Sequence, residues 1–278
     1  MKNIGLVIPS GRGDALAYAR EAASFLRDAG VEVYTEGWSQ EQIGNCRLLS
    51  DTMPLDVLVT LGGDGTLLRG AGYASAWNTP LLGVNLGRMG FLAETEPRLL
   101  KNALQALLDG AYDVEQRPML DVSVPGVGAW NAMNDAVLTR GGYARLITVH
   151  AMVDNEEAAC YHADGLIVAT PTGSTGYSLS AGGPIISPKV DCMVITPVCA
   201  HSLQHRPAVV QGSAKIRLEL GVDDEMTAAL QVDGQNRCML HGGETVFVRR
   251  SERCVRLVRL RESSFFQLVR HKLVEWSS

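Results

Sequence analysis

A glycine-rich turn around one carboxylate is the strongest chemical feature of the sequence. The turn reads Gly62-Gly63-Asp64-Gly65-Thr66 and follows the apolar run 55–61. Glycines lack the Cβ atoms that would keep a phosphate away from backbone N–H groups, and a helix beginning here would favour an anion. Asp64 could accept a proton from a hydroxyl group or serve as an outer ligand of a phosphate-bound magnesium ion. A structural alternative is open, in which the segment is a tight turn and Asp64 caps the helix.

A second chemical feature is the segment 164–184, in which most side chains after residue 169 are hydroxyl groups or hydrogen. Small hydrogen-bonding groups and an accessible backbone suit contact with a nucleoside. The alternative is a long surface loop without a ligand. Its length and its few charged residues favour a binding loop.

Other phosphate and metal motifs are incomplete. Ala71 stands where a P-loop requires lysine, and the segment 11–13 lacks the third glycine of a dinucleotide fingerprint. His201 and His205 are spaced for one face of a helix, but prolines bracket them and no third ligand is evident. We therefore expect a loop at these histidines and no metal site.

The elements that must position these residues change character along the chain. In the first third, apolar runs at 4–8, 31–34, 55–61 and 81–84 alternate with helical stripes. This pattern predicts an α/β domain with a parallel, Rossmann-like sheet, in which ligands lie beyond the carboxyl ends of the strands. The turn around Asp64 follows one such strand.

The rest of the chain has the period of two that is typical of antiparallel strands. The predicted strands are 119–124, 132–138, 146–153, 166–169, 193–198, 216–220 and 228–232. They predict an all-β, antiparallel, sandwich-like C-terminal domain. We place the α/β domain at 1–112 and the β-rich domain at 113–261, and we expect 262–278 to pack back on the first. The arginine-rich segment 249–261 is interpreted as an amphipathic edge strand and not as a nucleic-acid patch.

Composition excludes several classes of protein. The 278 residues include 46% hydrophobic and 20% charged side chains, so a disordered or fibrous chain is excluded. The net charge of −5 disfavours binding to nucleic acid. The six cysteines form no Cys-x-x-Cys pair, and we interpret them as small buried side chains in a reducing compartment. No apolar run approaches the roughly 18 residues of a membrane span, so we expect a cytoplasmic protein without membrane contact.

Five motifs in this order resemble the NAD kinase family, specifically its prokaryotic type. They are 62–69, Gly83-Val84-Asn85-Leu86-Gly87 with Gly90-Phe91-Leu92, Asn134-Asp135, 164–183, and His201-Ser202-Leu203 with Arg206-Pro207. The first motif is shared with lipid kinases, whereas the five together are specific.

The resemblance implies that ATP phosphorylates the 2′-hydroxyl of the adenosine ribose of NAD to give NADP. It implies that Asp64 is the general base and that Mg²⁺ is bound mainly through the ATP phosphates, with no protein metal ligand. It also implies a homodimer or homotetramer. The implied nucleotide-binding residues are Gly65, Arg69, Asn134, Asp135, Arg145, His162, Asp164, Thr175, Gly176, Tyr177, Ser178, Leu179, Ser180 and Gln235.

Three of these residues depart from the family pattern. Asp135 replaces the usual glutamate but keeps both acceptor oxygens. His162 replaces an arginine, and histidine is charged only near or below a pKa of roughly 6.5. Gly176 replaces the common alanine and should loosen the loop more than it alters its contacts.

Two rival functions are open at this point. A lipid or sphingoid kinase would share the turn around Asp64 but would need an apolar channel for its acceptor. A dinucleotide-binding regulator without catalysis would keep the nucleotide contacts and lack turnover.

Overall fold

The computed structural model describes residues 1–50, 54–87, 90–141, 146–202, 204–222, 226–261 and 264–277, with side chains of the last helix described as far as Lys272. Two compact units divide the chain. The first comprises Met1–Gln116 and Val255–Ser278, and the second comprises Arg117–Cys254. Among the described residues, no helix is long and apolar enough to cross a membrane.

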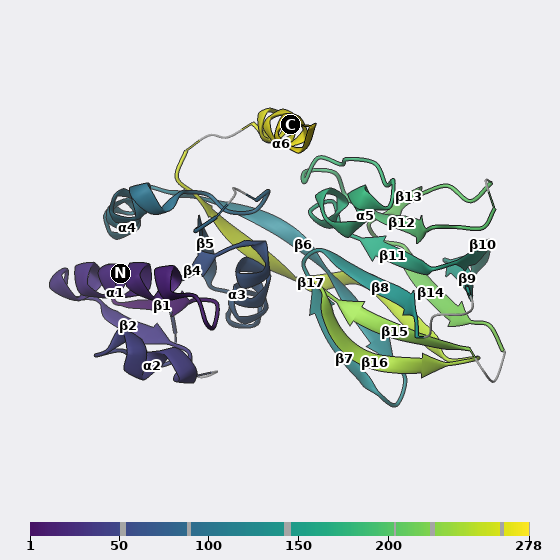
Figure 1. The fold of residues 1–278 in the computed structure, drawn as a ribbon, viewed down its shortest axis with the longest axis horizontal. Coiled ribbons are helices and arrows are strands. Elements are labelled where there is room, and N and C mark those ends of the chain that lie inside the picture. The colour runs from purple at the N-terminus through teal and green to yellow at the C-terminus, as the bar shows by residue number, and fades with distance from the viewer. Residues whose placement is uncertain are drawn as a thin grey trace. The chain divides into compact units, whose positions relative to one another are not determined.

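The first unit holds a parallel sheet with helices on both faces (Figure 1). The strands run in the order β17-β5-β4-β1-β2-β3, and every neighbouring pair is parallel. The strands are β1 Asn3–Val7, β2 Glu32–Thr35, β3 Arg47–Leu48, β4 Val57–Gly62, β5 Pro80–Asn85 and the end of β17 Thr245–Arg259. The helices are α1 Gly13–Asp28, α2 Gly37–Ile43, α3 Asp64–Trp77, the short 3-10 helix η1 Pro97–Leu99, α4 Leu100–Asp109 and α6 Phe265–Ser277.

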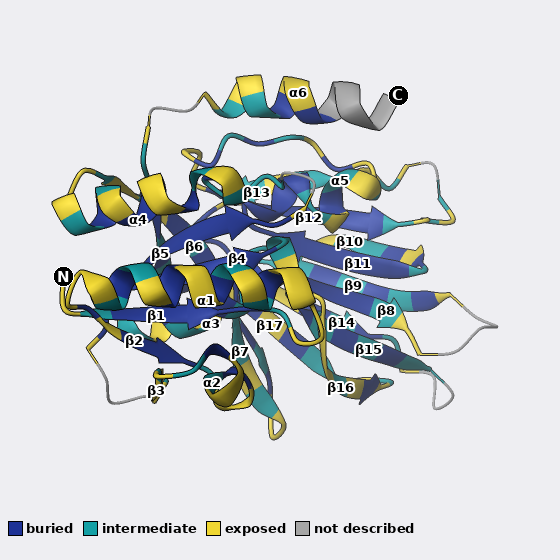
Figure 2. Ribbon diagram, turned by 60° about the vertical axis from the view of Figure 1, so that its left-hand side comes forward, coloured by how far each residue is buried: buried dark blue, intermediate teal, exposed yellow. Residues whose placement is uncertain are grey.

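Strand β4 shows why this sheet is covered on both sides. Val57, Val59 and Leu61 belong to a core cluster that also contains apolar residues of α1 and α4. On the other face, Gly70 of α3 lies directly against Thr60. Because side chains alternate along a strand, two covered faces require a continuous apolar run, and β4 is buried throughout (Figure 2).

The strand order creates a natural ligand position in this unit. From β1 the chain passes through α1 to β2, whereas from β4 it passes through α3 to β5 on the other side. The connections after β1 and β4 therefore diverge, and sheets of this kind bind ligands beyond the carboxyl ends of such strands. The α/β class predicted for this part of the chain is confirmed, and Asp64 follows β4 at this point.

The second unit is a sandwich of antiparallel sheets. One sheet has the order β13-β12-β11-β8-β15-β16, and the other runs β10-β9-β14-β17 with the β6–β7 hairpin paired to β17. Leu138 and Val168 of the first sheet share one core with Val149 and Leu218 of the second. The antiparallel, sandwich-like prediction is thus confirmed. The strands are β6 Asp113–Val124, β7 Gly128–Ala132, β8 Asp135–Arg140, β9 Ile147–Val153, β10 Glu156–Ala163, β11 Gly165–Ala169, β12 Cys192–Val198, β13 Ala208–Gln211, β14 Lys215–Leu220, β15 Thr227–Val232 and β16 Gln235–His241. The 3-10 helix η2 Gly173–Thr175 and the helix α5 Tyr177–Ser180 follow β11.

Three local predictions are wrong. The predicted strand 132–138 is two strands, because the backbone at Met133 and Asn134 bonds to a side chain and leaves the sheet. The arginine-rich segment is no edge strand, since β17 pairs with β14 through 245–249 and with β5 through 256–257. The prediction that the cysteines are buried is correct only for Cys192. Cys199 is exposed, and the other four are partly buried.

Candidate functional site

The turn of residues 62–66, here called the Asp64 turn, joins β4 to α3. Gly63 is the N-cap residue of α3, and no side chain caps this helix end. The interpretation of Asp64 as a helix-capping side chain is therefore wrong. Its carboxylate accepts a hydrogen bond from the backbone N–H of Phe91, and its Oδ1 is buried with no hydrogen-bond partner among the described residues. A buried carboxylate oxygen without a donor is costly unless a ligand supplies one.

Charge around Asp64 acts in two directions. Burial raises the pKa of the carboxyl above its usual value, whereas the N–H of Phe91 and the positive charge of Lys272 lower it. Lys272 lies on the buried face of α6 with Val269 and is only 5% exposed. A lysine is rarely buried to this degree without a partner charge. Asp64 thus lies in a partly desolvated site with a cation close enough to influence it.

The glycines of the Asp64 turn leave room outside the protein core. At Gly63 and Gly65, apart from the adjoining backbone and chain neighbours, no described residue has an atom within 4 Å of the position that a Cβ would occupy. The φ angle of Gly63 is −97°, which any residue adopts, so neither strain nor internal packing demands glycine there. Gly90 differs, because a Cβ at this residue would overlap the carboxylate of Asp64. Open space at the turn and close packing behind the carboxylate together suit the approach of a phosphate.

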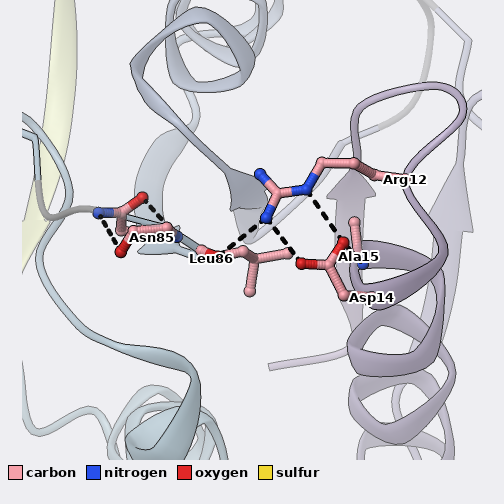
Figure 3. A network of polar contacts seen from close by, with 6 residues as sticks. Arg12, Asp14, Ala15, Asn85 and Leu86 are labelled. Atoms are coloured by element: carbon pink, nitrogen blue, oxygen red, sulfur yellow. Dashed lines mark hydrogen bonds and ion pairs between the residues drawn. The ribbon is translucent and has the colours of Figure 1, made fainter.

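A polar network ties the loops after β1 and β5 together (Figure 3). The Nη2 of Arg12 donates to Leu86 O at 2.9 Å and to Asp14 Oδ2 at 2.7 Å. Asn85 Oδ1 accepts from Gly87 N at 3.2 Å, and Leu86 N donates to Gly62 O at 3.0 Å. These hydrogen bonds fix Leu86, a few residues before Gly90 and Phe91, beside the Asp64 turn.

Two other predicted residues in the first unit have distinct surroundings. Gly65 is exposed at the start of α3. Arg69 lies one turn further along α3, where its Nη2 donates to Ile8 O and to Glu36 Oε2, the latter at 3.0 Å. Its Nε is buried without a partner in the described part of the chain. Arg69 thus links α3 to the end of β1.

In the second unit, residues 133–135 form a tight turn between β7 and β8, here called the Asn134 turn. The carboxylate of Asp233 accepts three backbone hydrogen bonds from it, with distances of 2.8, 2.7 and 3.2 Å to the nitrogens of Met133, Asn134 and Asp135. Thr170 Oγ1 donates to Met133 O at 2.6 Å, and Thr170 N donates to Asn134 O at 2.9 Å. The turn is therefore held from two sides.

The two carboxylates at the Asn134 turn influence each other. Burial, together with the like charge of Asp233, raises the pKa of Asp135 to about 7. Burial also raises the pKa of Asp233, against the effect of the three backbone N–H groups and of Arg237. The Oδ1 atom of Asn134 is buried with no hydrogen-bond partner among the described residues. The turn thus presents an unused acceptor next to a carboxyl group that titrates near neutrality.

The hydroxyl-rich segment after β11 packs on the Asn134 turn. A Cβ on Gly173 would overlap Asn134 O, and one on Gly176 would lie 3.6 Å from Asn134 Nδ2. Two of the predicted hydroxyl contacts are already used within the protein, because Thr175 Oγ1 donates to Thr172 O and Ser178 Oγ bonds to Thr196 Oγ1. Tyr177 and Ser180 are exposed, and Gly176 and Leu179 are partly buried. Thr175 and Ser178 therefore build the segment, whereas Tyr177 and Ser180 are free to meet a ligand.

The remaining predicted residues lie elsewhere in the second unit. Gln235 is exposed at the start of β16, two residues after Asp233, and pairs with Val232 of β15. Asp164 precedes β11 and pairs with Arg140 at 3.2 Å, while His162 on β10 contacts Thr148 Oγ1 at 3.0 Å. Arg145 lies outside the described residues.

The unit therefore holds two separate groups of predicted residues. Asp135 pairs with Ala169 at one end of β11, and Thr139 pairs with Gly165 at the other. With about 3.3 Å per strand residue, these ends are about 13 Å apart. The structure brings Asn134, Asp135 and Gly176 together and leaves Asp164 with His162 at the far end.

Sequence reasoning missed Asp233 and Lys272. In the sequence, Asp233 stands out only as part of an Asp-Gly turn, and its bonds to residues about 100 positions away have no local signal. Lys272 lies within an apolar helical stripe, where its position on the buried face could have drawn attention to it.

Both halves of the chain match family models. Residues 4–112 match the ATP-NAD kinase N-terminal domain, and residues 133–260 match the ATP-NAD kinase C-terminal domain.

Relatives and solved structures point the same way. The chain is 38% identical to the NAD kinase of Syntrophotalea carbinolica over 281 residues, covering 98% of both chains, and 43% identical to that of Gemmatimonas aurantiaca over 243 residues, covering 86% of this chain and 83% of the relative. It is similar to the crystal structure of yeast NADH kinase complexed with NADH, with a TM-score of 0.86, 28% identity and coverage of 97% and 86%. An NAD kinase from Archaeoglobus fulgidus in complex with ATP gives a TM-score of 0.77, 26% identity and coverage of 97% and 98%. The resemblance seen in the five motifs is confirmed, and the chain belongs to the ATP-NAD kinase family of phosphotransferases.

Proposed function

We propose that this protein transfers the terminal phosphoryl group of ATP to the 2′-hydroxyl of the adenosine ribose of NAD, with Asp64 as the general base. The observation that carries the proposal is the buried Oδ1 of Asp64 just after β4, which has no hydrogen-bond partner in the part of the chain that the structure describes. An acceptor in this position suits a hydroxyl proton, and the open glycine positions beside it suit a phosphate.

The chemistry asks little of the base. Phosphoryl transfer has a loose transition state, so positioning and charge neutralisation supply most of the acceleration. Asp64 takes the ribose proton as the new O–P bond forms, and the ADP oxygen leaves with the electrons of the broken bond. Burial raises the pKa of Asp64, which makes it a better base than an exposed aspartate.

A magnesium ion fits this arrangement as a companion of ATP. The unpartnered negative oxygen of Asp64 and the open turn are compatible with a nucleotide whose phosphates carry a cation. Mg²⁺ would neutralise charge on the donor phosphates. We assign its ligands to those phosphates and name no protein ligand.

Nucleoside binding is assigned to the second unit. The unused Oδ1 of Asn134 and the carboxyl group of Asp135 suit ribose hydroxyls or an adenine amino group. Exposed Tyr177 can contribute a ring for stacking. Asp164, His162 and Gln235 remain proposed contacts on the strength of the family resemblance, as do a cytoplasmic location and a homodimeric or homotetrameric assembly.

The proposal is tested with purified full-length protein, ATP, Mg²⁺ and NAD. We expect NADP to form and to be detected by an NADP-specific dehydrogenase. NAD binding without NADP above the blank would contradict the kinase assignment and favour a dinucleotide-binding regulator. Parallel reactions with sphingosine or diacylglycerol test the lipid kinase alternative, for which we expect no product.

A further inference from the structure

We infer that Asp233 is a positioning residue for dinucleotide binding, because its carboxylate shapes the Asn134 turn and so presents Asn134 and Asp135 to the nucleoside. The inference rests on the proposed function. It adds a residue that touches neither the ribose nor the phosphates and acts through the turn.

The carboxylate of Asp233 binds the backbone of the whole Asn134 turn. One side chain accepts from three consecutive backbone nitrogens, Oδ2 from Met133 and Oδ1 from both Asn134 and Asp135. β7 belongs to one sheet and β8 to the other, and these bonds hold the backbone where the chain passes between them. Hydrogen bonds to a charged acceptor are stronger than neutral ones. Without the Asp233 carboxylate, three N–H groups lose their acceptor.

Asp233 is itself held in place by the backbone. Its φ angle is 48° and it begins the turn between β15 and β16, where its own N–H donates to Asp135 O at 3.0 Å. The side chain bonds to the Asn134 turn in one direction and the main chain bonds back to it in the other. This reciprocal contact fixes the Asn134 turn to a neighbouring hairpin.

What the turn presents points to a ligand. The buried Oδ1 of Asn134 has no partner in the described part of the chain, although the main chain of the same residue is fully engaged. A free acceptor on a rigid turn next to a carboxyl group is what a ribose or adenine donor needs.

The charges that face Asp135 are few and come from known elements. Asp233 faces it from the β15–β16 turn, and Arg237 of β16 acts on Asp233. Arg117 of β6 donates to Thr172 Oγ1 at 3.3 Å in the hydroxyl-rich segment. Residues 170–183 carry no acidic or basic side chain. Loss of the negative charge of Asp233 should therefore lower the pKa of Asp135.

The test measures NAD binding without ATP, by calorimetry on the full chain, together with the ¹³C NMR titration of the Asp135 carboxyl. We expect Asp233→Asn to weaken NAD binding about 10-fold, because an amide offers one acceptor oxygen in place of two. We also expect the titration midpoint of Asp135 to fall by at least about one pH unit. A side chain that only stabilised the fold away from Asp135 would not move this midpoint.

Asp154→Asn is the matched control. Asp154 also lies in a hairpin turn with a positive φ angle, of 49°, and also accepts a backbone hydrogen bond, from Lys215 N at 2.8 Å. It should change neither NAD affinity nor the midpoint. Unchanged affinity or an unchanged midpoint in Asp233→Asn would overturn the inference.

Failure of the inference and failure of the proposed reaction give different results. If Asp233→Asn weakens NAD binding but the wild type forms no NADP, the inference stands and the proposed reaction fails. If the wild type forms NADP but Asp233→Asn binds NAD normally, the reaction stands and the inference fails. If the variant does not fold, the wild-type amide signals of Met133, Asn134 and Asp135 decide. They should shift when NAD is added, and a lack of any shift would overturn the inference.

Discussion

Asp64 and Asp135 are two carboxylates in similar places with opposite neighbours. Asp64 begins α3 just after β4, Asp135 begins β8, and burial raises the pKa of each. At Asp64 the nearby charge is the cation Lys272, which opposes the effect of burial. At Asp135 it is the anion Asp233, which adds to that effect and takes the pKa to about 7. Burial sets the direction in both cases, and the sign of the neighbour decides how far the pKa moves.

The comparison separates two chemical roles. At Asp64 a cation opposes the effect of burial on the pKa, which suits a carboxylate that takes a proton as a base. A carboxyl group that titrates near neutrality carries its proton part of the time, so Asp135 can donate as well as accept a hydrogen bond.

The role of Asp64 as the general base is tested most directly by removing the charge of its side chain. Asp64→Asn keeps the size of the side chain but cannot accept the ribose proton. We expect kcat to fall by about 10² to 10⁴-fold, the usual contribution of a general base. NAD affinity should stay within several-fold of the wild type, measured by calorimetry. Normal turnover in this variant would show that Asp64 is not the base.

Position is tested separately from charge by Gly90→Ala. The added methyl would overlap the carboxylate of Asp64 and displace it. A misplacement of about 1 Å can cost about 10²-fold in rate, so we expect a fall in kcat of this order with little change in NAD affinity. Gly87→Ala is the control, because no described residue other than its chain neighbours has an atom within 4 Å of its Cβ position. Equal rates for the two variants would show that close packing behind Asp64 is unimportant.

The part of this comparison that sequence could predict is the local part. The apolar run before Gly62 and the glycines around Asp64 lie in one stretch of chain, so the strand, the turn and the carboxylate were all predictable. The neighbours that set each pKa come from far away, Lys272 more than 200 residues and Asp233 about 100 residues along the chain. A local pattern carries no trace of such contacts, which is also why the break between β7 and β8 was missed.

A smaller effect is expected when the neighbour of Asp64 loses its charge. Lys272→Met should raise the pKa of Asp64, because the cation that lowers it is gone. The acidic limb of the pH profile of kcat/KM should then move upward by about half to one pH unit. Lys272→Arg should restore the limb, and Arg270→Met, at an exposed position of the same helix, should leave it unchanged. If the acidic limb of the profile does not move in Lys272→Met, the charge of Lys272 does not affect the pKa of Asp64.

The smallest effect concerns stability on the Asp135 side. The folded state raises the pKa of Asp135 from 3.8 to about 7, so between these values it binds more protons than the unfolded chain. The contribution of Asp135 to the free energy of unfolding should therefore fall as the pH rises from about 4 to about 7. Asp135→Asn removes this titration, so its thermal midpoint relative to the wild type should be higher at pH 8 than at pH 5. The two pH units between pH 5 and the folded pKa of about 7 correspond to about 3 kcal/mol, so the relative gain in thermal midpoint is about 5 to 10 °C. The measurement is scanning calorimetry of both proteins at the two pH values. An equal gain in thermal midpoint at both pH values would mean that the fold does not raise the pKa of Asp135. The difference between the two carboxylates would then depend on Lys272 alone.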